Sequence, residues 1–529
     1  MKKAISRFAD LLSPARRRLQ QARAKWGKQA VKEGGSESHL FDLTRDSIPS
    51  ALDDKTWIDL ELPQVFVALN STETSVGSQY LYRQLRTVGQ SPQEIVEHQS
   101  LRKLLREDSA LRERVQRELS GLRDERIEYL VDAVFGSDLS VSGAMKFLPW
   151  WSLACAAMIT SAMALNLSPW IIVAVATLNL LAIVKFALPL HRTLEVLRAC
   201  YRMLCVAEAL AGISSEQELP REISELRSRT PERRQALSKL RLVASLQSGV
   251  NAYITVWLNL AVLAELAACV RTVRSFNGFR KELAAAFELL GKLDAAIAVA
   301  SFLQSQRDWC EPAFTNAKKL AFTEVRHPLI ANPVSNSISL DDQCALITGS
   351  NMAGKTTFIK TVGINVVLAR ALGFCLARNA TIPTMSIMAS IRTDHSVSSG
   401  KSKFFVELEA IRSFVEAADS GQCGLFLLDE PFSGTNTVER LALGRAVLES
   451  LSAHAIVLAT THDVELQADL SAHYDLFHFQ EDPDVDGYFD YRLRLGHSAK
   501  RNAIRLLERE GFPEKLILTA LGYAQAYAR

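Results

Sequence analysis

Residues Gly349–Thr356 read G-S-N-M-A-G-K-T and match the phosphate-binding loop G-x-x-x-x-G-K-[ST]. An apolar run at 345–347 precedes the loop, and a segment of helical character follows it from Thr357. Between a strand and a helix, such a loop turns its backbone amides inward around the phosphates of a nucleotide. The sequence therefore predicts a site for a nucleoside triphosphate with Mg²⁺.

Residue types within the loop suggest separate tasks. Gly349 and Gly354 allow backbone conformations that a Cβ resists. Lys355 supplies a positive charge between the β- and γ-phosphates, and the hydroxyl of Thr356 suits the metal. The expected nucleotide-binding residues are Gly349, Ser350, Asn351, Met352, Ala353, Gly354, Lys355, Thr356 and Thr357.

Two further apolar runs end in polar residues. The run 425–428 is followed by Asp429 and Glu430, and the run 455–461 is followed by His462. Such runs are typical of strands buried on both faces, and open α/β sheets bind ligands at the carboxyl ends of their strands. Asp429 is suited to the Mg²⁺ shell, and Glu430 to orienting or deprotonating the attacking water. His462 can sense the γ-phosphate, although a histidine there alone would more often be structural.

Charge is unevenly distributed along the chain. The 529 residues carry a net charge of only +3, but residues 1–33 hold ten lysines and arginines against two acidic residues. This basic arm suits an anionic membrane surface or nucleic acid. A solvated tail is an equally good interpretation for part of it.

Cysteine and histidine usage limits the class of protein. The eight cysteines are scattered without a C-x-x-C pair, and the ten histidines show no metal-ligand spacing. This favours a reducing compartment over a disulfide framework or a zinc site. The first apolar stretches are too short and interrupted for a cleavable signal peptide.

A long apolar hairpin interrupts an otherwise charged, helical N-terminal half. Residues 147–167 carry no charge, and residues 170–190 carry only Lys185. Each segment is long enough to cross a bilayer core as a helix, about 30 Å. Tryptophans lie near the segment ends, at positions 150, 151 and 170. We predict a transmembrane hairpin over 147–190, with a hairpin buried in a large helical domain as the alternative.

Flanking charges orient this hairpin. Basic residues flank both ends, whereas the connecting 166–168 is uncharged. The positive-inside rule then places both termini and the ATPase domain in the cytosol, at the inner (cytoplasmic) membrane; a buried hairpin would make the protein cytoplasmic. A third apolar stretch, 253–270, is interrupted by Asn259 and Glu265. We expect it to be a core or interface helix, and membrane contact stays open.

Together these motifs resemble the MutS DNA mismatch-repair ATPases, a branch of the ABC superfamily. Five segments carry the resemblance in order: Arg326–Pro328 (R-H-P), Thr348–Thr357 (T-G-S-N-M-A-G-K-T-T), Ser399–Leu408 (S-G-K-S-K-F-F-V-E-L), Asp429–Thr437 (D-E-P-F-S-G-T-N-T) and Thr461–His462 (T-H). Weaker likeness covers roughly 50–525, apart from the apolar hairpin.

The resemblance implies specific roles. Asn351, Lys355 and Thr356 would bind phosphates and Mg²⁺, Glu430 would be the catalytic carboxylate, and His462 would sense the γ-phosphate. Ser402 would act in trans on the partner's nucleotide, so the active unit would be a homodimer with composite sites. DNA is an implied partner.

Departures from the family pattern restrict what can be carried over. Only about 45 residues precede the core-like region, without the family's mismatch-reading Phe-x-Glu element, and the hairpin stands where long clamp helices are expected. Ser350 and Ala353 replace proline and glycine, which are also small. ATPase chemistry therefore carries over well, whereas mismatch specificity does not.

These observations predict an all-helical core with an inserted apolar hairpin, followed by an ABC-type P-loop domain with a mainly parallel sheet. The expected parts are a basic arm (1–45), a helical core (46–146), the hairpin (147–190), a second core part (191–320) and the ATPase domain with C-terminal dimerising helices (321–529). The expected function is ATP hydrolysis coupled to DNA binding at the membrane, with a role in repair or recombination. The alternative is an ATP-driven conformational protein that acts on a protein or lipid partner without DNA.

Overall fold

The computed structural model describes residues 20, 23–24, 26–28, 37–48, 50–123, 128–136, 139–141, 143–214, 219–246, 251–391, 403–420, 424–463, 465–481, 489–497 and 511–527. The chain forms two compact units. The first, here called the helical unit, comprises Met1–Ile48, Val67–Gln84 and Glu97–Ser305. The second, here called the ATPase unit, comprises Pro49–Phe66, Leu85–Val96 and Gln306–Arg529.

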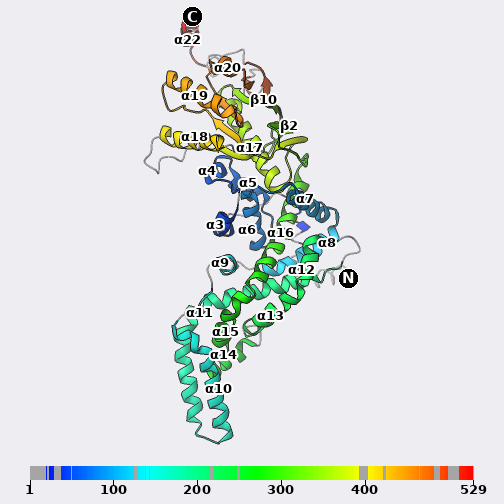
Figure 1. The fold of residues 1–529 in the computed structure, drawn as a ribbon, viewed down its shortest axis with the longest axis vertical. Helices are drawn as coiled ribbons and strands as arrows, with labels where there is room; N and C mark the ends of the chain where they lie inside the picture. The colour runs from blue at the N-terminus through cyan, green and yellow to red at the C-terminus, as the bar shows by residue number, and fades with distance from the viewer. Residues whose placement is uncertain are drawn as a thin grey trace. The chain divides into compact units, whose positions relative to one another are not determined.

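Helices dominate the first 305 residues (Figure 1). In chain order they are α3 (His39–Thr44), η1 (Arg45–Ser47), α4 (Asp54–Asp59), α5 (Leu62–Leu69), α6 (Ser75–Arg86), α7 (Pro92–Glu107), α8 (Ser109–Leu119), η2 (Ser120–Leu122), α9 (Glu128–Phe135), η4 (Gly143–Phe147), α10 (Leu148–Ala164), α11 (Trp170–Ala211), α12 (Arg221–Ser228), α13 (Thr230–Ser245), α14 (Asn251–Val262), α15 (Ala264–Ser275), η5 (Phe276–Gly278) and α16 (Arg280–Ser305).

Strands and helices alternate in the C-terminal part. The elements are β1 (Ala313–Thr315), β2 (Lys319–Val325), β3 (Asn336–Asp341), β4 (Cys344–Thr348), η6 (Asn351–Ala353), α17 (Lys355–Leu372), β5 (Asn379–Pro383), β6 (Ser386–Ser390), α18 (Lys403–Asp419), β7 (Gly424–Asp429), α19 (Thr437–Ser452), β8 (Ile456–Thr461), α20 (Glu465–Leu470), β9 (Tyr474–Glu481), β10 (Phe489–Leu495) and α22 (Glu514–Tyr527).

The main sheet of the ATPase unit has, among the described residues, the strand order β10-β9-β4-β8-β7-β6. Every pair is parallel except β10 with β9. Every residue of β4, β7 and β8 is buried, because a parallel sheet is covered on both faces. The helices α18 and α19 pack together against this sheet (Figure 1). Helices combined with a mainly parallel sheet confirm the predicted fold class at this level.

A smaller mixed sheet, β1-β5-β2-β3, completes the ATPase unit. The early segment 49–66 packs into this unit, because α4 lies against β6: the hydroxyl of Thr56 accepts from the amide of Ala389, and Asp59 accepts from the amide of Ile391. This attachment joins distant parts of the sequence and carries no sequence motif.

The helical unit has one large apolar core, formed mainly by α8, α11, α13, α15 and α16. Part of the basic arm packs against this unit. Arg23 pairs with Glu113, Trp26 lies under the guanidinium of Arg112, and the amide of Gly27 donates to Ser301. Arg23 is therefore already engaged by a carboxylate. The first 19 residues of the arm lie outside the described residues.

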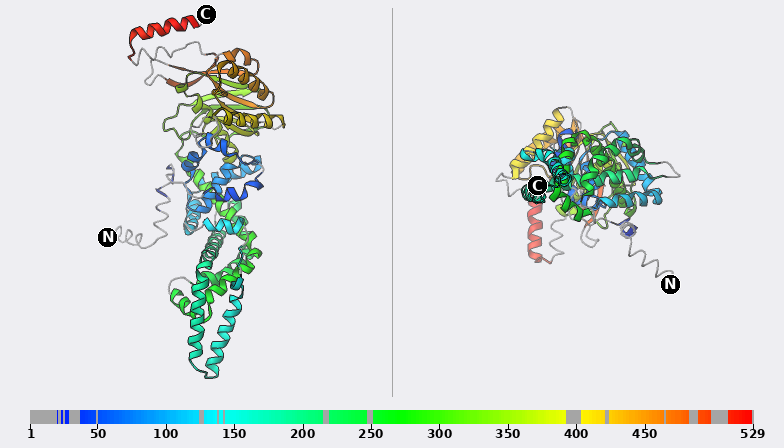
Figure 2. Two further views of the ribbon diagram at one scale, coloured as in Figure 1. Left: turned by 90° about the vertical axis from the view of Figure 1, so that its left-hand side faces the viewer. Right: turned by 90° about the horizontal axis from the view of Figure 1, so that it is seen from below.

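The apolar hairpin is formed by α10 and α11, which extend beyond the rest of the helical unit (Figure 2). Many of its large side chains are exposed, including Trp150, Met163, Trp170, Val184 and Leu188. By length and composition both helices could cross a membrane. One expectation is corrected: the second helix does not end near residue 190 but continues to Ala211, where its last turns join the core.

The third apolar stretch is not a single helix. It breaks at Leu263, whose φ of 49° is left-handed, and the flanking helices α14 and α15 are bent by 80°. Residues of α15 are mostly buried, whereas much of α14 is exposed. The expectation of a single helix over 253–270 is therefore wrong: α15 lies in the core, whereas α14 leaves an apolar surface exposed.

Candidate active site

The register of the main sheet brings three sequence motifs to one edge. Thr348 at the end of β4 pairs with Thr461 at the end of β8, and Asp429 at the end of β7 pairs with Thr460. Since these strands are parallel, the segments that leave them start side by side. The phosphate-binding loop, Glu430 and His462 are thereby placed together.

The loop after β4 adopts a conformation that depends on its glycines. Gly349 has a φ of 135° and Gly354 has a φ of 101°. A Cβ on Gly349 would lie 2.6 Å from the carbonyl oxygen of Phe479, and one on Gly354 would lie 3.2 Å from the ring of Tyr491. Both glycines are therefore required by backbone shape and by close neighbours. Helix α17 starts directly after the loop, so its positive N-terminal end faces the loop.

Lys355 is the buried cation of the site. Only 1% of its surface is exposed, and its Nζ donates to the carbonyl oxygen of Gly349 at 2.7 Å. The Nζ also lies 3.7 Å from Oε1 of Glu430. Burial lowers the pKa of Lys355 to about 8, against the attraction of Glu430 and Asp429. Added negative charge, such as phosphate oxygens, would therefore favour the protonated lysine.

Thr356 and Asp429 present oxygens toward each other. The hydroxyl of Thr356 donates to Oδ2 of Asp429 at 2.8 Å, and the hydroxyl of Thr460 donates to Oδ1 of the same carboxylate. Oxygen donors of this kind are those that Mg²⁺ prefers. The pair matches the two protein ligands expected for the metal.

Glu430 is held in a sparsely populated conformation. Its φ is 50°, and its amide donates to the carbonyl and hydroxyl oxygens of Thr460 at 3.1 Å each. Its carboxylate contacts Nε2 of His462, and the His462 ring lies 3.5 Å from the Nζ of Lys355. A left-handed non-glycine residue costs about 1–2 kcal/mol. That cost is consistent with a side chain aimed for function.

A cavity of about 140 Å³ opens beside this pair. Its lining includes Glu430 and His462, together with Arg440 and Asp463, whose side chains form a bidentate ion pair at 2.8 Å for both contacts. Asp463 follows His462 directly, so the ion pair fixes the backbone that carries the histidine.

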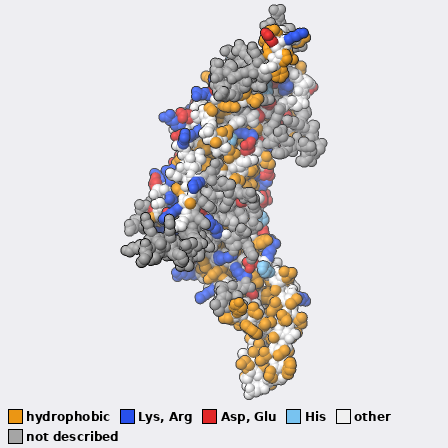
Figure 3. Space-filling model, turned by 180° about the vertical axis from the view of Figure 1, so that it is seen from behind, with side chains coloured by type: hydrophobic (Ala, Val, Ile, Leu, Met, Phe, Trp, Pro, Cys, Tyr) orange, Lys and Arg blue, Asp and Glu red, His pale blue; other side chains and the backbone are white. Residues whose placement is uncertain are grey.

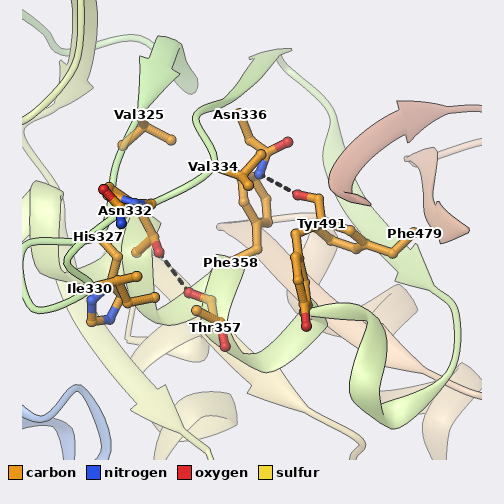
Figure 4. Close-up of a pocket in the computed structure, with 13 residues that line it drawn as sticks. Val325, His327, Ile330, Asn332, Val334, Asn336, Thr357, Phe358, Phe479 and Tyr491 are labelled. Atoms are coloured by element: carbon orange, nitrogen blue, oxygen red, sulfur yellow. Dashed lines mark hydrogen bonds between the residues drawn. The ribbon is translucent and has the colours of Figure 1, made fainter. Parts of the chain in front are cut away.

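A second cavity, of about 240 Å³, lies next to the loop, and its lining includes Gly354 and Thr357 (Figure 4). Its wall is mostly apolar and aromatic: Val325, Ile330, Val334, Phe358, Phe479 and Tyr491. The side-chain amide of Asn336 donates to the carbonyl oxygen of Tyr491 at 3.0 Å and so ties β10 to β3. His327 contributes a buried ring, and burial lowers its pKa, which favours the neutral form. The R-H-P segment gave a sequence signal for His327, but nothing marked Tyr491 or Phe479.

The residues present fit a triphosphate. The hydroxyl of Ser350, within the loop, is buried without a hydrogen-bond partner among the described residues. Such orphaned polar atoms are rare unless a ligand or water serves them. The loop also has no room for a Cβ at Gly349, and a Cβ at Gly354 would make a tight contact with Tyr491. An orphaned donor, a buried lysine and a carboxylate–hydroxyl pair at one loop are the features that a nucleotide with Mg²⁺ requires.

One motif lies partly beyond the described residues. Ser402 is outside them, as are residues 392–401, so its predicted action on a partner subunit remains a prediction. The same motif contributes a residue that the sequence did not single out. Glu407 on α18 accepts from the amide of Phe432 at 2.6 Å, and Phe432 has a φ of 62°. Glu407 thus supports the turn that follows Glu430.

Comparison with known proteins identifies this domain. A family model described as MutS domain V matches residues 345–527. The C-terminal part of the chain is therefore similar to MutS domain V. MutS-family domain V is an ATPase domain, so the prediction of a P-loop ATP hydrolase is confirmed at the level of the family.

Individual MutS-family relatives agree with this match. The DNA mismatch repair protein MutS of Natronomonas pharaonis is 29% identical over 262 residues, which cover 46% of this chain and 30% of the relative. The endonuclease MutS2 of Carboxydothermus hydrogenoformans is 31% identical over 249 residues, 46% of this chain and 32% of the relative. The MutS of Thermus aquaticus is 29% identical over 249 residues. The chain thus spans about a third of the length of these relatives.

Proposed function

We propose that this protein hydrolyses ATP at the site built around Lys355 and uses the cycle to change the state of a homodimer that binds DNA at a membrane. The observation that carries the ATPase part is the placement of Lys355, Thr356, Asp429, Glu430 and His462 at one sheet edge. Each is the residue type that phosphoryl transfer to water needs at that place.

Each residue then has a defined task. Loop amides and the Lys355 ammonium hold the β- and γ-phosphates, and Thr356 with Asp429 would hold Mg²⁺. Bound Mg²⁺ supplies charge neutralisation on the phosphate oxygens. Glu430 orients the attacking water and accepts its proton, while His462 holds that carboxylate and reads the γ-phosphate. The apolar cavity lined by Tyr491 is suited to the adenosine.

The test of this chemistry separates binding from turnover. Lys355→Ala should lose ATP binding, because the charge between the phosphates is removed. Glu430→Gln should still bind ATP but hydrolyse it at a rate lower by about 10²-fold or more. Glu416→Gln, in an exposed surface pair with Arg412, is the matched control and should leave both unchanged. Normal hydrolysis by Glu430→Gln would overturn the assignment of that carboxylate.

The dimeric part rests on the family resemblance of the Ser402 motif. Ser402→Ala should impair turnover, and so should Lys355→Ala. If the serine of one subunit completes the site of the other, mixed dimers of these two variants contain one intact composite site. Such mixtures should recover up to half of the wild-type activity per dimer. No recovery in verified mixed dimers would mean that each site works within one subunit.

The DNA part is supported by relatives that are named as DNA mismatch repair proteins. Binding of detergent-purified protein to duplex, mismatched and junction DNA should weaken steeply with salt, because phosphate contacts release counterions. The absence of binding to any of these at low salt would leave an ATP-driven protein that acts on a protein or lipid partner.

The membrane part is supported by the exposed apolar surface of α10 and of the first half of α11, where residues 170–190 carry only one charge, Lys185. Hydrophobic side chains cover the face of the hairpin seen in Figure 3. A surface of this kind is unfavourable in water but favourable among acyl chains. Deleting 147–190 should release the protein from the membrane fraction of cells. Unchanged pelleting with membranes would contradict the anchor.

A further inference from the structure

The short helix α14 carries an apolar surface that nothing among the described residues covers. Large side chains on it are exposed: Tyr253 by 80%, Ile254 by 52%, Val256 by 57%, Trp257 by 73% and Leu258 by 38%. The helix contains no charged residue. It packs against both α10 and α11, so this surface continues the apolar surface of the hairpin.

The carbonyl groups of the last turn of α14 form hydrogen bonds with a side chain of the protein. Asn179 on α11 is fully buried, and its side-chain amide donates to the carbonyl oxygens of Leu260 at 2.9 Å and Ala261 at 2.8 Å. Its Oδ1 accepts from the indole nitrogen of Trp151 on α10 at 2.8 Å. One asparagine thus connects α10, α11 and the last turn of α14. The last carbonyls of a helix lack intrahelical partners and usually turn to solvent.

The backbone at the start of α15 also forms hydrogen bonds with a side chain. Oδ1 of Asn259 accepts from the backbone amide of Glu265 at 2.8 Å, and the side-chain amide of Asn259 donates to the Glu265 carboxylate at 3.0 Å. The same carboxylate pairs with Arg198, which also pairs with Glu195 at 2.7 Å. Both sides of the break at Leu263 are therefore closed by side chains. Irregular backbone within a bilayer is tolerated only when protein satisfies its polar groups.

Helix geometry gives the depth of this break along the hairpin. Asn179 is nine residues from Trp170, where α11 begins after the hairpin turn. At 1.5 Å per residue this is about 14 Å, roughly half of a 30 Å hydrocarbon core. The 12 residues of α14 reach only about 18 Å, too short to cross. Helices α13 and α15, which come before and after α14 in the chain, both contribute to the core of the helical unit.

We propose that α14 is a third membrane-embedded element that does not cross the bilayer. It rests its Tyr253–Leu258 surface on acyl chains, stops near mid-depth where Asn179 caps it, and returns through α15 to the side it came from. This inference rests on the proposed insertion of the hairpin and adds a re-entrant helix to it. The occupant of the surface is lipid, and a second copy of the chain or another protein is the competing outcome of the test.

Depth-dependent fluorescence quenching tests the re-entrant helix α14 separately from the membrane hairpin of α10 and α11. An environment-sensitive fluorophore is attached to full-length protein at Trp257→Cys on α14, at Leu181→Cys on α11, or at Leu495→Cys on β10. These variants are made in a background that lacks the less buried or undescribed thiols, Cys205, Cys310 and Cys423. The protein is reconstituted in phosphatidylcholine–phosphatidylglycerol vesicles with lipids that carry a nitroxide on the acyl chain. Positions 181 and 257 should lose emission to a similar extent, and position 495 should not.

Each outcome is decisive. Quenching at 181 without quenching at 257 would overturn the re-entrant helix and leave the hairpin in place, with protein covering α14. No quenching at either position would overturn the membrane hairpin itself and the inference with it.

A second measurement tests the role of Asn179. Asn179→Leu leaves the carbonyls of Leu260 and Ala261 without a donor, so the segment 259–264 should exchange its amide hydrogens faster in vesicles. Thr177→Val is the matched control, because the Thr177 hydroxyl donates to the carbonyl oxygen of Val173 within its own helix. Retained ATPase activity would show that the variant is folded. Equal exchange in the two variants would contradict a capping role.

Discussion

Replacing the buried lysine of the phosphate-binding loop should stabilise the nucleotide-free protein while it destroys nucleotide binding. Lys355 is 1% exposed, and its pKa falls from an ordinary 10.5 to about 8 because burial outweighs the attraction of Glu430 and Asp429. A fall of this size corresponds to about 3 kcal/mol of folding free energy at neutral pH, since one pKa unit is about 1.4 kcal/mol. Lys355→Met keeps the apolar stem and removes the charge.

The expected gain at pH 7 is about 1–3 kcal/mol, because the two carboxylates also lose a cation. For a domain of this size it corresponds to a rise in unfolding temperature of about 2–4 °C per kcal/mol. The assay is thermal unfolding of the full-length protein in detergent. Lys319→Met is the control, since Lys319 and Asp341 form an exposed pair on the smaller sheet and such pairs contribute little.

The pH dependence gives an independent check. A lysine whose pKa is lowered by folding binds its proton less readily in the folded state than in the unfolded state. Between pH 8 and 10.5 the unfolded chain therefore binds more protons, and the stability of the wild type rises with pH. The advantage of Lys355→Met should accordingly shrink to about half or less at pH 9.5. A folded Lys355→Met that unfolds at a lower temperature at pH 7, or an advantage independent of pH, would refute the reasoning.

Added MgATP should reverse the order of the unfolding temperatures, so that the wild type unfolds at a higher temperature than Lys355→Met. Ligand at 1,000 times its dissociation constant stabilises the wild type by about 4.1 kcal/mol, which exceeds the expected advantage of Lys355→Met. Lys355→Met should gain much less at the same concentration. Equal shifts would show that the lysine does not hold the phosphates.

Three further substitutions test the surroundings of the site. Gly349→Ala should weaken ATP binding and lower the unfolding temperature, because the added Cβ would lie 2.6 Å from the Phe479 carbonyl oxygen. Gly496 also has a positive φ, but the space around it is open, so Gly496→Ala should lower the free energy of unfolding only by the backbone strain of about 1–2 kcal/mol. Asn365→Ala should cost about 2–4 kcal/mol in denaturant unfolding, because this buried amide bonds Arg326, Thr361 and Leu376; a loss below about 1 kcal/mol would contradict this. Arg440→Lys should slow turnover with little change in unfolding temperature, because a lysine cannot form the bidentate pair with Asp463 that fixes the backbone next to His462; unchanged kcat would exclude this support.

Local sequence was sufficient for the chemistry of the site and for the strands that position it. A phosphate-binding loop depends on glycines, a lysine and a threonine at fixed offsets. Asp429 is the last residue of the buried strand β7, and Glu430 and His462 directly follow the buried strands β7 and β8. Parallel pairing then brings strand ends together without further information. The placement of these residues could therefore be predicted from periodicity and motif alone.

Tertiary contacts decided the features that join distant segments. No local pattern showed that α4 packs against β6, or that Tyr491 and Phe479 enclose the apolar cavity beside the loop. The continuation of α11 to Ala211 reflects packing of its last turns into the core, which overrides the end expected at the charged flank.

The third apolar stretch, 253–270, shows most clearly what the sequence alone cannot predict. By itself the sequence determined its hydrophobicity and the two polar interruptions, but it could not say which backbone groups Asn259 and Glu265 would satisfy. The break at Leu263 is stable because Asn179, some 80 residues earlier in the chain, supplies the missing donors. A residue's periodicity records which face of a helix it occupies, whereas the partner of a freed carbonyl depends on what the fold brings beside it. The sequence thus determined the ATPase site, and the tertiary structure decided how α14 ends and which surface it leaves exposed.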